Sequence, residues 1–260
     1  MKRPLILVTN DDGILAPGIK ALIEVAKTIG EVVVVAPDSP QSAKGHALTI
    51  IDPIYLRKVD PFDGIEAYEC SGTPVDCVKI AKSIVFKDRK AALCVSGINH
   101  GSNASINIIY SGTVSAAMEA SLEGIPSIGF SLLDYSQDAD FEPAKGFVAQ
   151  LMRYVLQNGM EHGHLWNVNI PKLPAAEIKG FKVCRQAEAR WAEEFVEGED
   201  AYGQKNYTLT GEFKLEDQGE DTDIWALDNQ YISIVPSMHD LTNHDSIPRL
   251  KGVESLNSKM

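Results

Sequence analysis

The chain contains 260 residues, of which 44% are hydrophobic, so it is long enough to bury a full core within one domain that carries an appendage. Its formal net charge of −12 and the absence of a basic cluster in the sequence exclude a nucleic-acid-binding surface, because duplex binding relies on Lys and Arg side chains. The short apolar run after Met1 fits neither a secretion signal nor a membrane span, and we expect a cytoplasmic protein that contacts no membrane.

The first half of the chain predicts alternating strands and helices. Residues 5–8 form a continuous apolar run that ends at a turn, as in a strand buried on both faces. Apolar residues then recur at helical spacing over 19–29 and stop at Gly30, and residues 32–36 predict the next buried strand. Two strands joined by such a helix predict a parallel sheet with its ligand loops at the carboxyl ends of the strands.

The same alternation continues to about residue 160, with Thr73 and Pro74 in the pattern of a helix start. The further predicted elements are a helix at 75–83, a strand at 92–96, a helix at 113–123, a strand at 127–132 and a helix at 144–157. We therefore predict an α/β fold, with a three-layer α/β/α body and a mostly parallel sheet over residues 1–160.

The pattern changes over residues 161–260. Short β-like runs are separated there by acidic loops that contain glycine, such as 193–203 and 217–223. The predicted strands are 166–170, 181–184, 207–209 and 231–235. This part of the chain predicts a smaller β-rich appendage and a C-terminal segment that serves oligomerisation.

Three loops rich in side-chain oxygens follow predicted buried strands. The first contains Asp11 and Asp12, the second contains Ser42, and the third contains Asn99. In a parallel sheet these loops can converge on one crevice, and hard oxygen donors favour Mg²⁺, Mn²⁺ or Ca²⁺ over zinc. Because Asp and Gly are also common turn residues, an ordinary turn remains the alternative for the first loop.

A possible anion site lies where residues 110–113 open a predicted helix. Amides and hydroxyls at a helix N-terminus favour a bound anion, so a phosphate is chemically sensible there. Ordinary helix capping by the same hydroxyls is the alternative.

Two rival phosphatase patterns occur and are interpreted as accidental. Cys184 and Arg190 match C-x5-R, but the residues between them contain no glycine and include a carboxylate. Asp221 and Asp223 match D-x-D, but they lie in a polar loop rather than after a buried strand. The four cysteines form no C-x-x-C pair, which is typical of reduced structural thiols.

The motifs over residues 5 to about 170 resemble the survival protein E (SurE) family of stationary-phase 5′/3′-nucleotidases. The matching segments, in family order, are ILVTNDDGILAPGI, VVVVAPDSPQSAKGHALTI, CSGTPVDCVKIA, CVSGINHGSNASINIIYSGTVSAAMEASLEGIPSIGFS and WNVNIP. The resemblance implies a Rossmann-like body, a protruding hairpin and C-terminal exchange in homodimers or homotetramers. It also implies hydrolysis of nucleoside 5′- and 3′-monophosphates, and in some members of short polyphosphate.

The resemblance further implies one divalent metal ion per subunit, Mg²⁺ or Mn²⁺, with Ca²⁺ as a possible occupant in crystals. By this resemblance the metal ligands are Asp11, Asp12, Ser42 and Asn99. The residues implied to act in catalysis are Asp11, Asp12 and Asn99. The implied phosphate contacts are Asn10, Gly97, Asn103, Ser111, Gly112 and Thr113. The lack of a credible nucleophile pattern favours direct attack by water over a covalent intermediate.

The sequence departs from the family pattern in two places. In the second loop Lys44 and His46 replace familiar partners, and near the C-terminus the segment around His239 and Asp240 is atypical, which leaves their roles open. His100 has two readings, as a leaving-group acid or as a solvated loop residue.

Two other functions remain alternatives to a nucleotidase. One is a non-catalytic, metal-dependent nucleotide-binding module, and the other is a hydrolase of different phosphoesters such as polyphosphate or a sugar phosphate. A metal-dependent turnover assay separates the first alternative from an enzyme, and a substrate panel separates the second.

Overall fold

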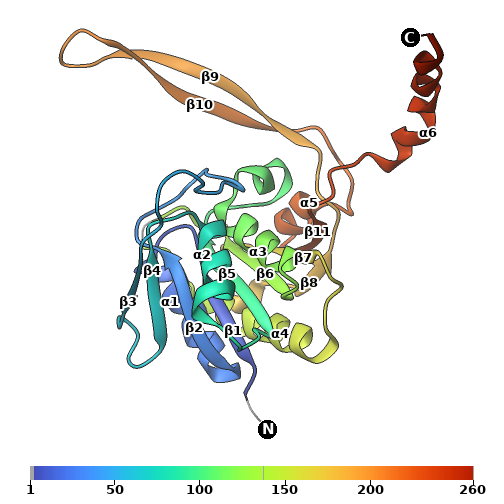
Figure 1. The fold of residues 1–260 in the computed structure, drawn as a ribbon. Coiled ribbons are helices and arrows are strands. Elements are labelled where there is room, and N and C mark those ends of the chain that lie inside the picture. Colours follow the sequence, from blue (N-terminus) through green and yellow to red (C-terminus); the bar gives the residue numbers. More distant parts are fainter. Residues whose placement is uncertain (1–2, 137, 260) are drawn as a thin grey trace.

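The computed structural model describes residues 3–136 and 138–259, and its central feature is a sheet of nine strands covered by helices (Figure 1). The strand order is β3-β4-β2-β1-β5-β6-β7-β11-β8. Its strands are β1 (Leu5–Thr9), β2 (Glu31–Pro37), β3 (Leu56–Val59), β4 (Glu66–Cys70), β5 (Leu93–His100), β6 (Ser127–Leu132), β7 (His164–Ile170), β8 (Phe181–Val183) and β11 (Ile232–Met238). From β4 to β7 all neighbours are parallel, which confirms the predicted α/β fold.

Helices cover both faces of the sheet, which explains the continuous apolar runs. Ile6 and Val8 of β1 pack with α1 and α4, whereas Leu5 and Leu7 face the layer that contains α2 and α3. The helices are α1 (Pro17–Ile29), α2 (Pro74–Ile80), α3 (Gly112–Leu122), α4 (Glu142–Asn158), α5 (Asp223–Asp228) and α6 (Ile247–Leu250). Every side chain of β1 is buried, and its residues are apolar from Leu5 to Val8, with a polar residue only at Thr9 where the strand ends.

The helices and strands predicted for the first 160 residues are all present, with ends shifted by a few residues. The start of α2 is a capping box, in which Thr73 accepts from the Asp76 amide and Asp76 accepts from the Thr73 amide. Strands β3 and β4 were not predicted from the sequence. Both are short, partly exposed and at one edge of the sheet, so neither carries a buried apolar run.

The strands beyond residue 160 fall into two groups. Strands β7, β8 and β11 join the central sheet, whereas β9 (Ala189–Glu199) and β10 (Lys205–Leu215) form an antiparallel ribbon that projects from the body, as does the C-terminal tail (Figure 1). The expectation of a loop over 193–203 was wrong up to residue 199, because an exposed ribbon can pair through its backbone without an apolar pattern. The division of the chain into domains at residue 160 stays a prediction.

None of the helices in the described ranges, 3–136 and 138–259, is long and apolar enough to cross a membrane.

The core predicts a stability test at Phe130, a fully buried side chain of β6. We expect Phe130→Ala to lower the free energy of unfolding by about 3–5 kcal/mol, because the lost burial is joined by a cavity. Ile51→Ala, at a side chain that is 94% exposed, is the control and should change it by less than about 0.5 kcal/mol. Urea unfolding measures both, and a small loss for Phe130→Ala would show that this part of the core is not tightly packed.

Candidate active site

The three predicted ligand loops lie at one edge of the sheet because their strands are neighbours. β1 pairs in parallel with β2 on one side and with β5 on the other, so all three strands have their carboxyl ends together. Asp11 and Asp12 follow β1, the loop with Ser42 follows β2, and Asn99 lies near the end of β5. The topology thus brings the three loops to the same edge, as predicted for a parallel sheet.

Asp11 lies in the contact between this edge and the first turn of α3. The Thr113 hydroxyl donates a hydrogen bond to Asp11 Oδ1 and lies 3.5 Å from Asn99 Oδ1. A Cβ atom on Gly112 would come within 2.7 Å of the Asp11 Cβ, so only glycine permits this approach. The structure therefore brings together Asp11, Asn99, Gly112 and Thr113.

The two carboxylates are held in an environment that disfavours negative charge. Burial, followed by the neighbouring Asp12 charge, raises the pKa of Asp11 to about 6, although hydrogen bonds from the Thr113 hydroxyl and amide oppose the rise. Burial also raises the pKa of Asp12, while the charge and the amide of His100 act in the opposite direction. Within the described residues neither carboxylate forms an ion pair with Lys, Arg or His.

The polar atoms around these carboxylates fit a divalent cation. Asp12 Oδ2 and Asn10 Oδ1 are buried and have no hydrogen-bond partner among the described residues. Buried acceptors without donors are rare, and a hard cation is the partner that carboxylate and amide oxygens prefer. No group of three or more His, Cys, Asp or Glu with metal-binding geometry occurs in the part of the chain that the structure describes. An ion here would therefore depend on the two carboxylates together with neutral oxygens.

The loop that carries Ser42, residues 38–50, is called the serine loop below. Its Gln41 amide donates to the carbonyl oxygen of Asp11 at 2.7 Å, and the Ile14 amide donates to the carbonyl oxygen of Pro37 at 2.9 Å. These contacts bring the loop beside the aspartate turn, and Ser42 itself is exposed. The role of Ser42 as a metal ligand stays a prediction.

The hydroxyls at the start of α3, those of Ser111 and Thr113, have different roles. Ser111 caps the helix, since its hydroxyl accepts from the Val114 amide at 3.0 Å. The Thr113 hydroxyl is not a cap, because it faces Asp11. Ser111 therefore caps the helix, and Thr113 contacts the site.

Asn103 is held by a buried polar network that the sequence did not predict. Its side-chain amide donates to Ser131 Oγ at 2.9 Å, and its backbone amide donates to Asn169 Oδ1 at 2.8 Å. The Asn167 amide donates to the carbonyl oxygen of Asn103 at 2.8 Å. The two asparagines alternate on a buried strand within WNVNIP, and polar residues at inward positions were the available signal.

Two further phosphate candidates lie close to the turn and to β6. Asn10 is buried, and its side-chain amide donates to the carbonyl oxygen of Gly13 at 2.9 Å. Gly97 has a φ of 122°, and a Cβ atom there would lie 2.3 Å from the Phe130 carbonyl oxygen. The backbone at Gly97 therefore requires glycine. Contact of either residue with a phosphate stays a prediction.

His100 is half-buried between two elements. Its Nδ1 lies 3.0 Å from the Ser136 carbonyl oxygen, and its ring packs edge-on against Phe141 at a centroid distance of 5.0 Å. Because a carbonyl oxygen only accepts, Nδ1 carries a hydrogen and Nε2 is left to act as acceptor or acid.

The rival phosphatase patterns are structural. The Cys184 thiol is buried, and burial raises its pKa, which is the opposite of what a cysteine nucleophile requires. Arg190 Nε lies 2.6 Å from Oε1 of Glu216, the residue after β10. Asp221 pairs with Arg185 at 2.8 Å, and the buried Asp223 accepts hydrogen bonds from backbone amides.

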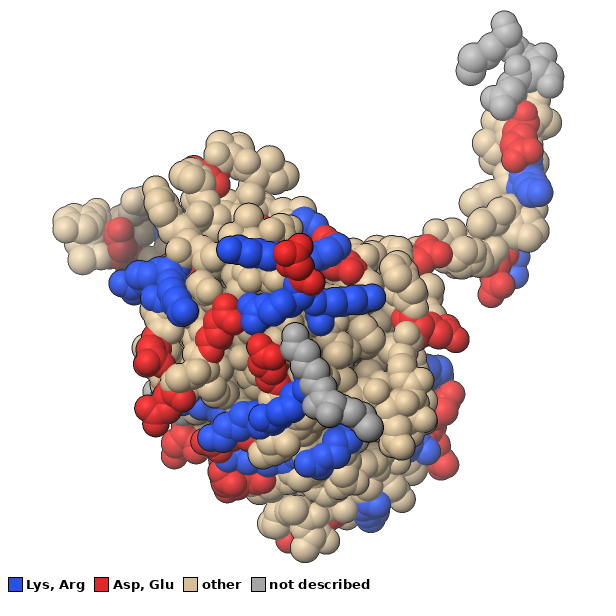
Figure 2. All heavy atoms as spheres, turned by 60° about the horizontal axis from the view of Figure 1, so that its bottom comes forward, with Lys and Arg blue, Asp and Glu red and all other residues tan. Residues whose placement is uncertain are grey.

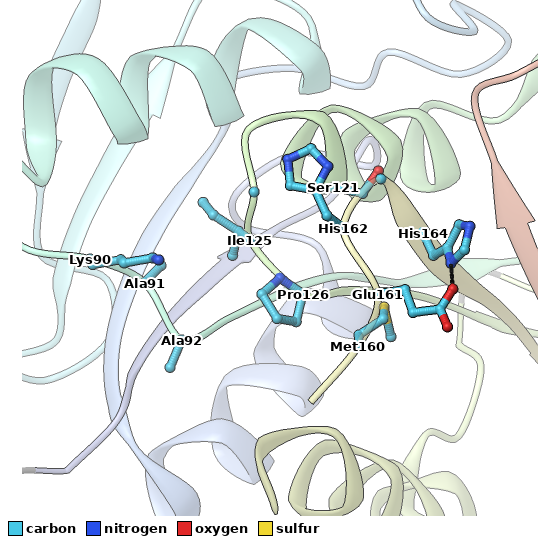
Figure 3. A pocket seen from close by; sticks show the side chains of 12 residues that line it. Lys90, Ala91, Ala92, Ser121, Ile125, Pro126, Met160, Glu161, His162 and His164 are labelled. Carbon is cyan, nitrogen blue, oxygen red and sulfur yellow. Dashed lines mark ion pairs between the residues drawn. The ribbon is translucent and has the colours of Figure 1, made fainter. Parts of the chain in front are cut away.

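A separate hollow of about 460 Å³ lies at the opposite edge, where β5, β6 and β7 begin (Figure 3). Lys90, His162 and His164 line it, and Figure 3 shows His164 directed at Glu161, 3.0 Å away. Figure 2 shows Lys and Arg side chains gathered on the face at the bottom of Figure 1, interspersed with Asp and Glu. None of the predicted site residues lines this hollow.

Fold and site together define a class of protein: an α/β protein with paired carboxylates at the carboxyl edge of a parallel sheet, beside the first turn of a helix. The model of the family described as Survival protein SurE matches residues 6–193. The chain therefore belongs to the SurE family.

Relatives of known name agree with this family over nearly the whole chain. The chain is 60% identical over 250 residues to the 5′-nucleotidase SurE of Flavobacterium johnsoniae, with 96% of each chain covered. It is 44% identical over 252 residues to the protein of the same name from Bacteroides thetaiotaomicron, again covering 96% of each chain. The solved SurE protein of Aquifex aeolicus is similar with a TM-score of 0.84 at 40% identity, covering 96% of this chain and 100% of that chain. The family resemblance of the motifs is thereby confirmed.

The contact between α3 and Asp11 predicts the behaviour of Thr113→Val, which keeps the side-chain shape and removes the hydroxyl. We expect kcat/KM for phosphate release to fall about tenfold to a hundredfold, because a hydrogen bond to a charged group contributes about 1.5–3 kcal/mol. Thr28→Val, which removes a hydroxyl bonded within α1, is the matched control and should retain activity. Equal kinetics for the two variants would show that Thr113 does not serve the site.

Proposed function

We propose that this protein hydrolyses nucleoside 5′-monophosphates, and also 3′-monophosphates, to nucleoside and inorganic phosphate with one divalent ion, Mg²⁺ or Mn²⁺, per subunit. It is an enzyme, a 5′-nucleotidase, as its relatives are named. The observation that carries the metal proposal is the buried Asp11 carboxylate beside the half-buried Asp12, whose buried Oδ2 has no hydrogen-bond partner among the described residues. Buried charges of one sign without a counter-charge indicate a place for a cation.

The residues that would hold the ion are Asp11, Asp12, Ser42 and Asn99. When bound, a divalent ion supplies positive charge and Lewis acidity at this edge of the sheet. The hydrogen bond from Thr113 holds the Asp11 carboxylate in one orientation, in which it would bind the ion. A carboxylate of the pair, Asp11 or Asp12, would orient the attacking water and accept its proton during attack on phosphorus.

The phosphate oxygens would meet the start of α3 and the third loop. The positive end of a helix dipole favours an anion, and Gly112 keeps the backbone close to Asp11. The third loop is rigid at Asn103, whose amides are tied to β6 and β7, so the donors of this loop keep their positions as charge develops. The proposed contacts are those of Asn10, Gly97, Asn103, Ser111, Gly112 and Thr113.

We also propose a homodimer or homotetramer in the cytoplasm. The projecting ribbon and tail support assembly, because they expose large apolar side chains that a single copy leaves in water. Phe195 on the ribbon is 65% exposed and Leu241 on the tail is 93% exposed.

The central test is phosphate release from nucleoside monophosphates with Mg²⁺, Mn²⁺ or EDTA, applied to wild type and to Asp12→Asn. The substitution removes a ligand charge with little change of volume, and we expect kcat/KM to fall by about a hundredfold or more. The fold should persist, because the residue lies in a loop outside the core. Asp88→Asn, at an exposed carboxylate in another turn, is the control and should match wild type. Full activity of Asp12→Asn, or wild-type turnover in EDTA, would contradict the proposal.

A second prediction separates this chemistry from a cysteine mechanism. Cys184→Ser should release phosphate at the wild-type rate, because the thiol is buried and donates to the carbonyl oxygen of Lys182 at 3.2 Å. Thermal unfolding identifies any loss that comes from stability. A well-folded but inactive Cys184→Ser protein would overturn direct attack by water.

A further inference from the structure

The serine loop is fastened to the body on both sides of Ser42. On the near side, the Gln41 amide donates to the carbonyl oxygen of Asp11 at 2.7 Å. On the far side, a hydroxyl at the start of α2 donates to the carbonyl oxygen of Ala47 at 2.7 Å. The loop is therefore an arch with both ends on the body, and Ser42 lies exposed near its first end.

The backbone of this arch adopts conformations that need support. Ala43 has a φ of 58° and Gly45 a φ of 56°, both in the left-handed region. The left-handed conformation is unfavourable for alanine and persists only where the surroundings impose it. The Gly45 amide donates to the Tyr110 carbonyl oxygen at 3.2 Å, which is a long hydrogen bond and a weak restraint by itself.

A further restraint on this part of the arch is the side chain of His46. Its Nε2 lies 2.9 Å from Glu119 Oε2, and the other carboxylate oxygen of Glu119 lies 2.5 Å from Lys79 Nζ. Glu119 is only 4% exposed. Hydrogen bonds from His46 and then from Lys79 lower the pKa of Glu119, so the carboxylate is charged at neutral pH. Glu119 thus forms charge-assisted contacts with two donors, one from the serine loop and one from α2.

Glu119 belongs to the helix that also contacts the metal-binding turn. α3 touches Asp11 through Gly112 and Thr113 in its first turn, and Glu119 follows about two turns later on the same helix. One rigid element therefore contacts Asp11 at one end and the serine loop through His46 at the other. The helix thus joins the aspartate turn to the His46 side of the serine loop.

We propose that His46 and Glu119 are positioning residues of the active site, which hold the serine loop on α3 so that Ser42 faces the aspartate pair. This inference rests on the proposed function, since it assigns the loop its place in the same metal site. His46 touches no reacting atom in this account. It acts through the backbone of the arch, and its loss leaves the aspartates intact.

Trypsin reports the position of the arch independently of turnover, because Lys44 is exposed at its centre. In His46→Ala we expect cleavage after Lys44, followed by mass spectrometry, to be about tenfold faster than in wild type, since a hydrogen bond to a charged group is lost. Lys82→Ala is the matched control. It breaks an ion pair between Lys82, which follows α2, and Glu123, which ends α3, and this pair does not involve the serine loop.

Calorimetric titration with Mn²⁺ tests whether the arch serves the site. His46→Ala should weaken the Kd for Mn²⁺ about tenfold, and His46→Gln, whose amide can donate to Glu119, should restore most of the affinity. Lys82→Ala should bind Mn²⁺ as wild type does. Circular dichroism verifies that each variant is folded.

The outcomes separate this inference from the proposed function. If His46→Ala is cleaved and binds Mn²⁺ as wild type does, the positioning role is overturned, and it is equally overturned if cleavage rises while Mn²⁺ affinity stays unchanged. If wild type binds Mn²⁺ but releases no phosphate, the proposed function fails, whereas the two readouts still decide the role of His46.

Discussion

Two adjacent carboxylates at the buried end of β1, which form no ion pair within the described structure, are the constraint on which the site depends. The sheet imposes it, because β1 is covered on both faces and delivers Asp11 into the interior as soon as the strand ends. Burying such a charge is unfavourable unless hydrogen bonds or an opposite charge compensate. Thr113 supplies part of that compensation, and the remaining oxygen of Asp12 is the part left for a ligand.

Helix α3 organises this compensation over its whole length. Its first turn lies against Asp11, where Gly112 allows contact and the N-terminal dipole favours negative charge. Glu119, farther along, is itself a buried charge, but it is paired with Lys79 and His46. The helix thus supplies a hydrogen-bond donor, Thr113, to Asp11. Its own buried carboxylate, Glu119, is paired with two side chains. Because the helix is rigid, the two environments are coupled in space.

Much of the fold could be predicted from the sequence, because strands buried on both faces are continuous apolar runs and their polar ends mark the ligand edge. The pairing of Asp11 with Thr113 could not, since the two residues are 102 positions apart and nothing local indicates the contact. The resemblance implied a protruding hairpin, but most of β9 was expected to be a loop, because exposed strands need no apolar alternation. Asn167 and Asn169 lie inward on a buried strand, where their role appears only once Asn103 is placed beside them.

The loops around the aspartates are held by interactions of different strength. The third loop is tied by a network of buried amides at Asn103, and buried networks are strong because no water competes for their donors. The serine loop is tied near the surface, where the His46 side chain is 36% exposed and water weakens each contact. The third loop is therefore the more strongly held of the two, and the serine loop is held by contacts that are more exposed to water.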